Sequence, residues 1–319
     1  MSSALYTASA TIDNAHEDDI WHTCWVPGKH QLASAGSDEV VKLWNAQTGE
    51  STGTLKDGDY AITSLDINAQ GTQLLTSSMD HKLRIWNLDP STLDQTAPAL
   101  TIDAQAINAW KSRFVPKRGD DGESLVASTT DRGTVKLWSA KRGKEVRELN
   151  TSRPKFLYAL AASPDGAKIA CAGVGSQVYL FDVESGALSC TFSGHSDNVR
   201  SVSFSADSSL LVTASDDKQV QMHDARFGSP AATFMGHYGW VLSAQMHPSG
   251  TYIASGSVDT KVKIWDIAQR TCVETHSQHA QAVWSVAWQR ASEDVDVPRP
   301  MLASTGEDRS VSLYDPLLA

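Results

Sequence analysis

One stretch of the sequence, residues 236–266, contains a complete structural unit that the rest of the chain repeats. It reads GHYGWVLSAQMHPSGTYIASGSVDTKVKIWD. Apolar and polar residues alternate along its first run, and the turn-forming residues His-Pro-Ser-Gly separate that run from a second one. A third short run ends at Trp265. This pattern predicts three short β-strands joined by tight turns.

Four polar side chains of this unit are spaced so that they can form one chain of hydrogen bonds. They are His237, Ser255, Asp259 and Trp265. An indole N–H can donate to the Ser hydroxyl, that hydroxyl can donate to the His ring, and the His ring can donate to the carboxylate. We therefore expect a structural tetrad that holds the strands of one unit together.

Aligning the whole sequence on Trp265 gives seven copies of the unit. The aligned residues are separated by 42, 52, 43, 42, 42 and 49 positions, and they are Trp44, Trp86, Trp138, Phe181, His223, Trp265 and Tyr314. A period of about 40–45 residues with four short strands per copy indicates small sheets arranged radially. The sequence predicts an all-β, seven-bladed β-propeller. The recurring Gly-His, Asp and Trp-Asp residues resemble the WD-repeat family from end to end.

The two ends of the chain complement each other. Residues 4–12 alternate as a strand would, whereas the last unit stops at Asp315-Pro316 without a fourth strand. We expect the N-terminal segment to supply the outer strand of the last blade, which closes the ring and removes an open sheet edge. Residues 1–319 are expected to form a single domain, because a closed all-β ring can exceed the usual domain length.

The other copies retain the tetrad to different degrees. The first copy has all four residues: His16, Ser34, Asp38 and Trp44. The fifth has His195, Thr213 and Asp217, with His223 in place of Trp. The seventh has His279, Ser304 and Asp308, with Tyr314 in place of Trp. The second copy has Gly58 in the His position, the third has Arg132 in the Asp position, and the fourth keeps only Phe181. Because Ser, His and Asp recur in register, we interpret them as architecture rather than as a catalytic triad.

Composition and short motifs argue against several classes of function. A formal net charge of −10 and the lack of a Lys/Arg cluster argue against direct nucleic-acid binding. Nucleotide-binding, hydrolase and metalloprotease motifs are not found, and the histidines outside the tetrads are scattered, so no enzyme activity, cofactor or metal site is expected. Neither a secretory signal nor a run of 18 apolar residues occurs, which predicts an intracellular protein without a membrane segment. The four cysteines are expected to be free, buried thiols.

A set of aromatic residues recurs in a register that the tetrads do not explain. The residue five positions after each tetrad His position, and the residue three positions after it, should lie near one rim of the ring. At these positions the sequence has Trp21, Trp110, Phe156, Tyr158, Arg200, Trp240 and Trp284. Trp, Tyr and Arg are enriched at binding hot spots, and an exposed group of them predicts a partner-binding face rather than packing between blades. We expect it to bind a short peptide or helix with an apolar anchor and an acidic or polar group for Arg200.

A narrower resemblance rests on longer runs of sequence. The runs are AHEDDIWHTCW, AINAWKSRF, KFLYALAASPDG, SADSSLLVTASDDKQVQMHDAR, GHYGWVLSA and VDTKVKIWDIAQRTCVETHSQHAQAVWSVAW. They resemble the WD-repeat subunit of the eukaryotic superkiller complex. The resemblance implies a non-catalytic subunit that binds a tetratricopeptide-repeat scaffold beside an RNA helicase and supports cytoplasmic 3′-to-5′ mRNA decay by the exosome. It also implies nuclear roles, with the meiotic topoisomerase-like protein in fungi and the Paf transcription-elongation complex in animals. The insertions at 115–123 and 290–300 depart from the plain hairpins expected of that family.

One alternative function comes from a different class. The sequence His223-Asp224-Ala225-Arg226 resembles the W-D-x-R box of propellers that act as substrate receptors of cullin-type ubiquitin ligases, although the Trp is missing. This reading is an analogy at the level of the fold. Loss of a ligase adaptor on Arg226→Ala would distinguish it from the superkiller reading.

Overall fold

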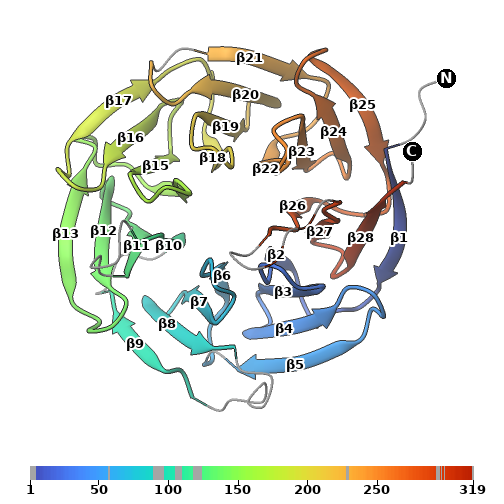
Figure 1. Cartoon of the computed structure of the whole chain (residues 1–319), viewed down its shortest axis with the longest axis horizontal. Coiled ribbons are helices and arrows are strands. Elements are labelled where there is room, and N and C mark those ends of the chain that lie inside the picture. Colours follow the sequence, from blue (N-terminus) through green and yellow to red (C-terminus); the bar gives the residue numbers. More distant parts are fainter. Residues whose placement is uncertain are drawn as a thin grey trace.

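The computed structural model describes residues 5–56, 58–88, 97–104, 110–117, 124–227, 230–291, 295, 297 and 299–317. Across these residues, 28 strands form seven four-stranded antiparallel sheets arranged around a ring (Figure 1). Each sheet is a blade whose innermost strand lies nearest the centre of the ring. The prediction of an all-β, seven-bladed propeller is therefore confirmed.

The first three blades contain strands β2 to β13. Blade one contains β2 (Ile20–Trp25), β3 (Gln31–Gly36), β4 (Val40–Asn45) and β5 (Ser51–Lys56). Blade two contains β6 (Ile62–Ile67), β7 (Gln73–Ser78), β8 (Lys82–Asn87) and β9 (Leu100–Asp103). Blade three contains β10 (Ser112–Val115), β11 (Leu125–Thr129), β12 (Thr134–Ser139) and β13 (Glu145–Asn150).

The remaining blades follow in chain order, except for one strand. Blade four contains β14 (Leu157–Ala162), β15 (Lys168–Gly173), β16 (Val178–Asp182) and β17 (Leu188–Phe192). Blade five contains β18 (Val199–Phe204), β19 (Leu210–Ser215), β20 (Gln219–Asp224) and β21 (Pro230–Met235). Blade six contains β22 (Val241–Met246), β23 (Tyr252–Ser257), β24 (Val262–Asp266) and β25 (Thr271–His276). Blade seven contains β26 (Val283–Trp288), β27 (Leu302–Gly306), β28 (Val311–Pro316) and the N-terminal strand β1 (Tyr6–Ile12).

Strand β1 closes the ring, as the sequence predicted. It pairs antiparallel with β28, from Tyr6 opposite Pro316 to Ile12 opposite Val311 (Figure 1). Tyr6 is buried, its ring contacts that of Trp288 with centroids 5.1 Å apart, and its backbone N–H donates to the Glu274 carboxylate of blade six at 3.1 Å. The closing strand is thus bound both to its own blade and to the neighbouring one.

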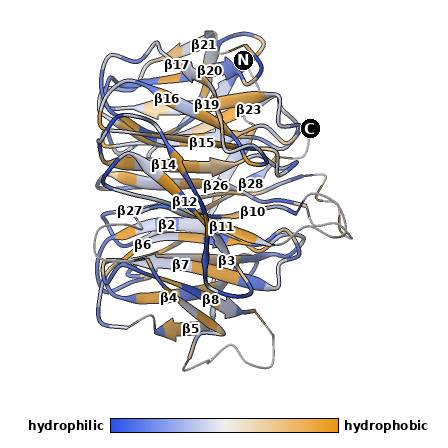
Figure 2. Ribbon diagram, turned by 90° about the vertical axis from the view of Figure 1, so that its left-hand side faces the viewer, coloured by the Kyte–Doolittle hydropathy of each residue, from blue (hydrophilic) through white to orange (hydrophobic). Residues whose placement is uncertain are grey.

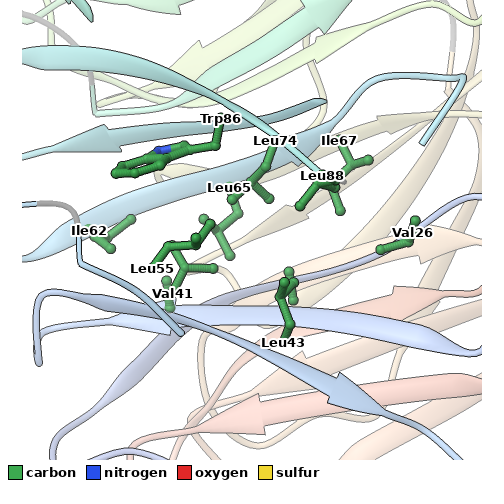
Figure 3. Packing of buried hydrophobic residues seen from close by; sticks show 12 residues of the cluster. Val26, Val41, Leu43, Leu55, Ile62, Leu65, Ile67, Leu74, Trp86 and Leu88 are labelled. Atoms are coloured by element: carbon green, nitrogen blue, oxygen red, sulfur yellow. The ribbon is translucent and has the colours of Figure 1, made fainter. Parts of the chain in front are cut away.

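The hydrophobic core lies between neighbouring blades. In the cluster of Figure 3, Val41 and Leu55 of blade one meet Leu65 and Trp86 of blade two, and all four side chains are buried. Figure 2 shows hydrophobic residues concentrated along the stacked strands, with hydrophilic residues in the connecting loops. Burial of apolar side chains on both faces of a sheet is what joins one blade to the next.

Other expectations have mixed outcomes. The four cysteines are free, but only Cys171 is buried; Cys24 and Cys190 are partly exposed and Cys272 is exposed, so the expectation of four buried thiols was wrong. Burial of a side chain in a two-sided sheet depends on which strand carries it, and Cys272 lies on the outermost strand β25.

No helix among the described residues is long and apolar enough to cross a membrane. Residues 118–123, 292–294, 296 and 298 of the insertions at 115–123 and 290–300 lie outside the described residues.

Candidate protein-interaction site

The tetrads form the rigid frame on which the candidate face is built. In blade six, His237 Nδ1 donates to Asp259 at 2.8 Å, Ser255 Oγ donates to His237 Nε2 at 2.7 Å, and Trp265 Nε1 donates to Ser255 Oγ at 2.8 Å. Burial by itself raises the pKa of the Asp259 carboxyl, but the hydrogen bond and charge of His237 and two backbone N–H groups together hold it well below its ordinary value. The carboxylate therefore stays ionised and fixes the His ring.

The same hydrogen bonds recur in three other blades. His16 contacts Asp38 and Ser34, and Trp44 donates to Ser34; His195 contacts Asp217 and Thr213; His279 contacts Asp308 and Ser304, and Ser304 bonds the Tyr314 hydroxyl at 3.0 Å. Blade five departs at its last member, because His223 Nε2 lies 3.4 Å from Thr213 Oγ1 and its buried Nδ1 has no hydrogen-bond partner. Burial lowers the pKa of His223 to about 4.

Blade two replaces its missing histidine with an arginine from within the same blade. Arg84 Nη2 pairs with Asp80 at 2.5 Å, and Arg84 Nη1 donates to Ser78 at 2.9 Å. A Cβ atom built on Gly58 would lie 3.4 Å from the Arg84 guanidinium, so that group fills the space beside the glycine. Trp86 still donates to Thr76, at 3.2 Å. Arg84 thus supplies to Asp80 the N–H donor that the tetrad histidine supplies in other blades.

The seven residues predicted to form the face contact one another in one continuous series of side-chain contacts. Trp284 lies 6.5 Å from Trp21, Trp21 stacks on Trp110 at 6.3 Å, and Trp110 meets Phe156 at 5.7 Å between ring centroids. The series continues from Phe156 to Tyr158 at 5.1 Å, and the Arg200 guanidinium lies 4.6 Å from the Tyr158 ring and 5.5 Å from the Trp240 ring. We call this set the aromatic face.

The aromatic face retains accessible surface. Six of its members are partly exposed, and Trp240 is exposed over 49% of its surface. Two residues in the same register, Thr63 and Leu242, are buried and do not contribute. The rings therefore pack against each other at the rim and are not buried between the sheets. A binding surface requires this arrangement.

Further apolar residues, which the sequence register did not identify, border the aromatic face. The backbone N–H groups of Met79, Val174 and Val258 bond the carbonyls of Ala61, Phe156 and Trp240, so they lie beside the loops that carry the face. All three side chains are exposed, and so are Tyr60, before β6, and Tyr238, at 86%. Their position in the repeat could have identified these residues in the sequence. Met79 and Val258 each directly precede the tetrad Asp of their blade, and Val174 precedes the glycine that replaces that Asp in blade four.

The aromatic face contains charged groups beside its rings, and Arg200 is one of them. Its guanidinium forms a bidentate ion pair with Asp216, with both N–O distances 2.8 Å, and these hydrogen bonds raise the pKa of the arginine. That Arg200 receives an acidic or polar group of a partner stays a prediction, although an acid on the adjacent strand connection already pairs with two of its nitrogens. Burial, followed by the neighbouring carboxylates Asp18 and Glu307, raises the pKa of Asp19, whose carboxylate accepts a hydrogen bond from the Trp21 indole. Arg309 acts in the opposite direction, so the charged neighbours of Asp19 at the Trp21 end of the face are two carboxylates and one cation.

Comparison with known proteins decides the family. The WD domain, G-beta repeat family matches residues 8–45, 49–87, 186–224, 228–266 and 270–315, which is more than half of the chain. The chain belongs to the WD-repeat family. The region of this WD-repeat protein without a match, residues 88–185, contains blades three and four, in which the tetrads are least complete.

Several relatives of this WD-repeat protein have known names. It is 33% identical to the WD repeat-containing protein VIP3 of Arabidopsis thaliana over 61% of this chain and 63% of the relative. It is 30% identical to the meiotic recombination protein rec14 of Schizosaccharomyces pombe, over 63% of this chain and 64% of that protein. It is 30% identical to the transcriptional corepressor LEUNIG_HOMOLOG of Arabidopsis thaliana, over 54% of this chain and 21% of that protein. Each alignment spans less than two thirds of the relative's length.

The remaining candidate chemistry is sparse. Within the part of the chain that the structure describes, no group of three His, Cys, Asp or Glu side chains is placed to hold a metal ion. Arg226, the arginine of the W-D-x-R-like sequence, forms an ion pair with Asp224 at 2.8 Å, and its side chain is exposed beside Phe227. Asp224 lies opposite Leu210 at the start of β19, whereas the aromatic face lies near the start of β18. The two features are thus at opposite ends of the blade.

Proposed function

We propose that this WD-repeat protein is a non-catalytic interaction scaffold that binds a partner segment on its aromatic face. The observation that carries the proposal is the continuous row of seven side chains, from Trp284 to Trp240, that retains exposed surface although no tetrad requires it. Removing large aromatic side chains from such a surface typically costs a complex about 2 kcal/mol or more for each hot spot.

The charges of the face suggest the chemistry of the partner segment. Asp19 is held at the edge of the Trp21 ring, Asp18 and Glu307 are close enough to raise its pKa, and Arg200 is already paired with Asp216. An apolar or aromatic anchor for the rings and a basic side chain for the carboxylates at the Trp21 end would therefore complement the face. We infer a short peptide or helix with that pairing.

The sequence resemblance suggests the complex in which this binding takes place. We infer that the chain is the WD-repeat subunit of the superkiller complex, bound to its tetratricopeptide-repeat scaffold beside the RNA helicase in cytoplasmic mRNA decay by the exosome. The names of two relatives, a meiotic recombination protein and a transcriptional corepressor, favour an additional nuclear role. The meiotic topoisomerase-like protein and the Paf complex are the nuclear partners that we infer. A substrate receptor of a cullin-type ligase is less favoured, because Arg226 is already paired within its own loop.

The test is quantitative affinity purification with three forms of the full chain. The first is wild type, the second combines Trp21→Ala, Trp240→Ala and Trp284→Ala, and the third is Phe227→Ala, which removes an exposed aromatic ring at the opposite end of the blades. We expect wild type and Phe227→Ala to recover the superkiller scaffold and helicase, and the triple variant to lose them while it melts normally.

Different results would contradict different parts of the proposal. Full recovery of partners by a normally melting triple variant would refute binding through the aromatic face. Recovery of only elongation or meiotic factors would place the protein in a nuclear complex, whereas a ligase adaptor lost on Arg226→Ala would favour the ubiquitin-ligase function.

A further inference from the structure

A group of ionisable side chains lies on or next to the innermost strands, and two of its members, His22 and Lys111, directly follow Trp21 and Trp110 of the aromatic face. We call it the inner-strand cluster, and its members are His22, Cys24, Asp66, Lys111, Arg113 and Arg290. Arg113, in blade three, donates from Nη2 to His22 Nε2, in blade one, at 3.1 Å. Because blade two lies between these blades, both side chains must extend towards the axis of the ring (Figure 1).

The cluster carries an excess of positive charge. It has three cations, Lys111, Arg113 and Arg290, but one carboxylate, that of Asp66. Asp66 accepts a hydrogen bond from the Phe114 backbone at 2.7 Å, and within the described residues no ion pair joins it to the three cations. Arg290 is exposed to solvent, whereas burial lowers the pKa of Lys111 well below its ordinary value and also lowers that of Arg113. Burial therefore disfavours the charged forms of Lys111 and Arg113 unless an anion lies beside them.

The hydrogen bonds of Arg113 determine the proton position on His22. Arg113 Nη1 donates to neutral oxygens, the Leu65 and Ser112 carbonyls at 2.9 Å and the Ser64 hydroxyl at 3.2 Å. A guanidinium only donates, so His22 Nε2 accepts from Nη2, and the proton of the neutral ring resides on Nδ1. Only 7% of His22 is exposed, and its Nδ1 is buried without a hydrogen-bond partner. The cluster thus includes a buried N–H donor that lacks an acceptor.

Lys111 is the second group without a partner. Among the described residues its ammonium has no hydrogen bond or ion pair, although its backbone N–H donates to Thr129 Oγ1 at 3.0 Å. Its side chain is partly exposed, as is that of Arg113, so a solute can reach this part of the cluster. Leaving a cation and an N–H donor unpaired in such surroundings is unfavourable, and an anion would satisfy both groups.

We propose that the inner-strand cluster binds a small oxyanion of the phosphate class. Lys111 and Arg290 supply charge, Arg113 fixes the His22 ring, and the His22 Nδ1–H donates to an oxygen of the anion. Arg290 is exposed and follows the end of β26, whereas Lys111 directly follows Trp110 and precedes β10. The cluster therefore extends along the innermost strands from the aromatic face towards the opposite mouth.

The experiment is a titration of the full chain with sodium phosphate, in which sodium chloride keeps the ionic strength constant. Calorimetry gives the affinity and a thermal melt gives the stabilisation. We expect one phosphate to bind wild type and raise its melting temperature, and Lys111→Met to bind at least about tenfold more weakly, the loss expected for one charge-assisted hydrogen bond. Lys144→Met is the matched control, because it removes the same charge from an exposed turn and should bind as wild type does.

Further arms keep the test decisive. If Lys111→Met does not fold, Arg290→Gln carries the same expectation, since its side chain lies at the surface. O-phosphoserine in place of phosphate distinguishes a free oxyanion from a phosphate ester, and binding of either compound supports the site. No binding of either compound to wild type would overturn the proposal, and so would equal affinities of wild type, Lys111→Met and Arg290→Gln. The triple Trp variant should still bind phosphate, which separates this inference from the aromatic face.

Discussion

Ser255→Ala is the substitution for which the tetrads make the sharpest prediction. Ser255 is fully buried, and its hydroxyl is the middle member of the hydrogen-bond chain in blade six. It receives the Trp265 indole N–H at 2.8 Å and donates to His237 Nε2 at 2.7 Å. Removing it leaves two buried polar groups without partners.

The expected cost follows from counting those groups. A buried polar group that loses its only partner costs about 1–3 kcal/mol, so Ser255→Ala should lower the free energy of unfolding by about 3–4 kcal/mol. Thr76→Val is the matched substitution in blade two, where the same position contacts only the Trp86 indole, at 3.2 Å, and no histidine is present. Because one group instead of two loses its partner, we expect a loss of about 1–2 kcal/mol.

The assay is guanidinium unfolding of wild type and both variants, monitored by Trp fluorescence and circular dichroism. Coincident curves from the two probes are required before free energies are compared, because repeat proteins can unfold in parts. Equal losses for Ser255→Ala and Thr76→Val, or a loss below about 1 kcal/mol for Ser255→Ala, would refute the reasoning that the serine hydroxyl satisfies two buried groups.

Three other predictions concern closure, acid stability and the arginine in blade two. Deleting residues 1–12 removes β1 and should lower the melting temperature by about 10 °C, and an unchanged melt would refute closure by that strand. The pKa of His223 is about 4 in the folded chain and near 6.5 when unfolded, so the unfolded chain binds the proton more tightly and stability falls as pH drops from 6.5 to 4. His223→Phe should remove up to about 3 kcal/mol of that loss in the free energy of unfolding. If the variant loses as much stability between pH 6.5 and 4 as wild type does, the loss does not come from His223. Arg84→Ala leaves Asp80 partly buried without its cation and should cost about 1–3 kcal/mol at neutral pH, whereas Lys144→Ala, on an exposed turn, should cost almost nothing in the same unfolding assay.

Much of the architecture could be predicted because it depends on spacing along the chain. A repeat near 42 residues, counted on Trp44 and its equivalents, fixes the number of blades once each unit must bury both faces against its neighbours. The missing fourth strand after Asp315 likewise predicted where β1 would pair. The same register brought together residues as distant in sequence as Trp21 and Trp284, because equivalent positions of a radial array lie at the same height around one axis.

The limits of that reasoning appear where one residue replaces another from a different position. Gly58 signalled a missing histidine, but nothing in the register indicated that Arg84 would occupy the space and pair with Asp80. Arg200 was correctly placed beside aromatic rings, yet its pairing with Asp216 could not be anticipated, since it depends on the direction of one side chain from β18 and one from the connection after β19.

The sequence alone determined the fold, the closure of the ring and the frame of polar tetrads. The fold and the tetrads follow from a local pattern that recurs every 42 to 52 residues, and the closure follows from the strand that the last copy lacks. Only the tertiary structure decided which side chains of different blades meet, as Arg113 meets His22 across blade two. Such contacts depend on the curvature of the ring and on the direction of each side chain, and neither is encoded in the spacing of a single repeat.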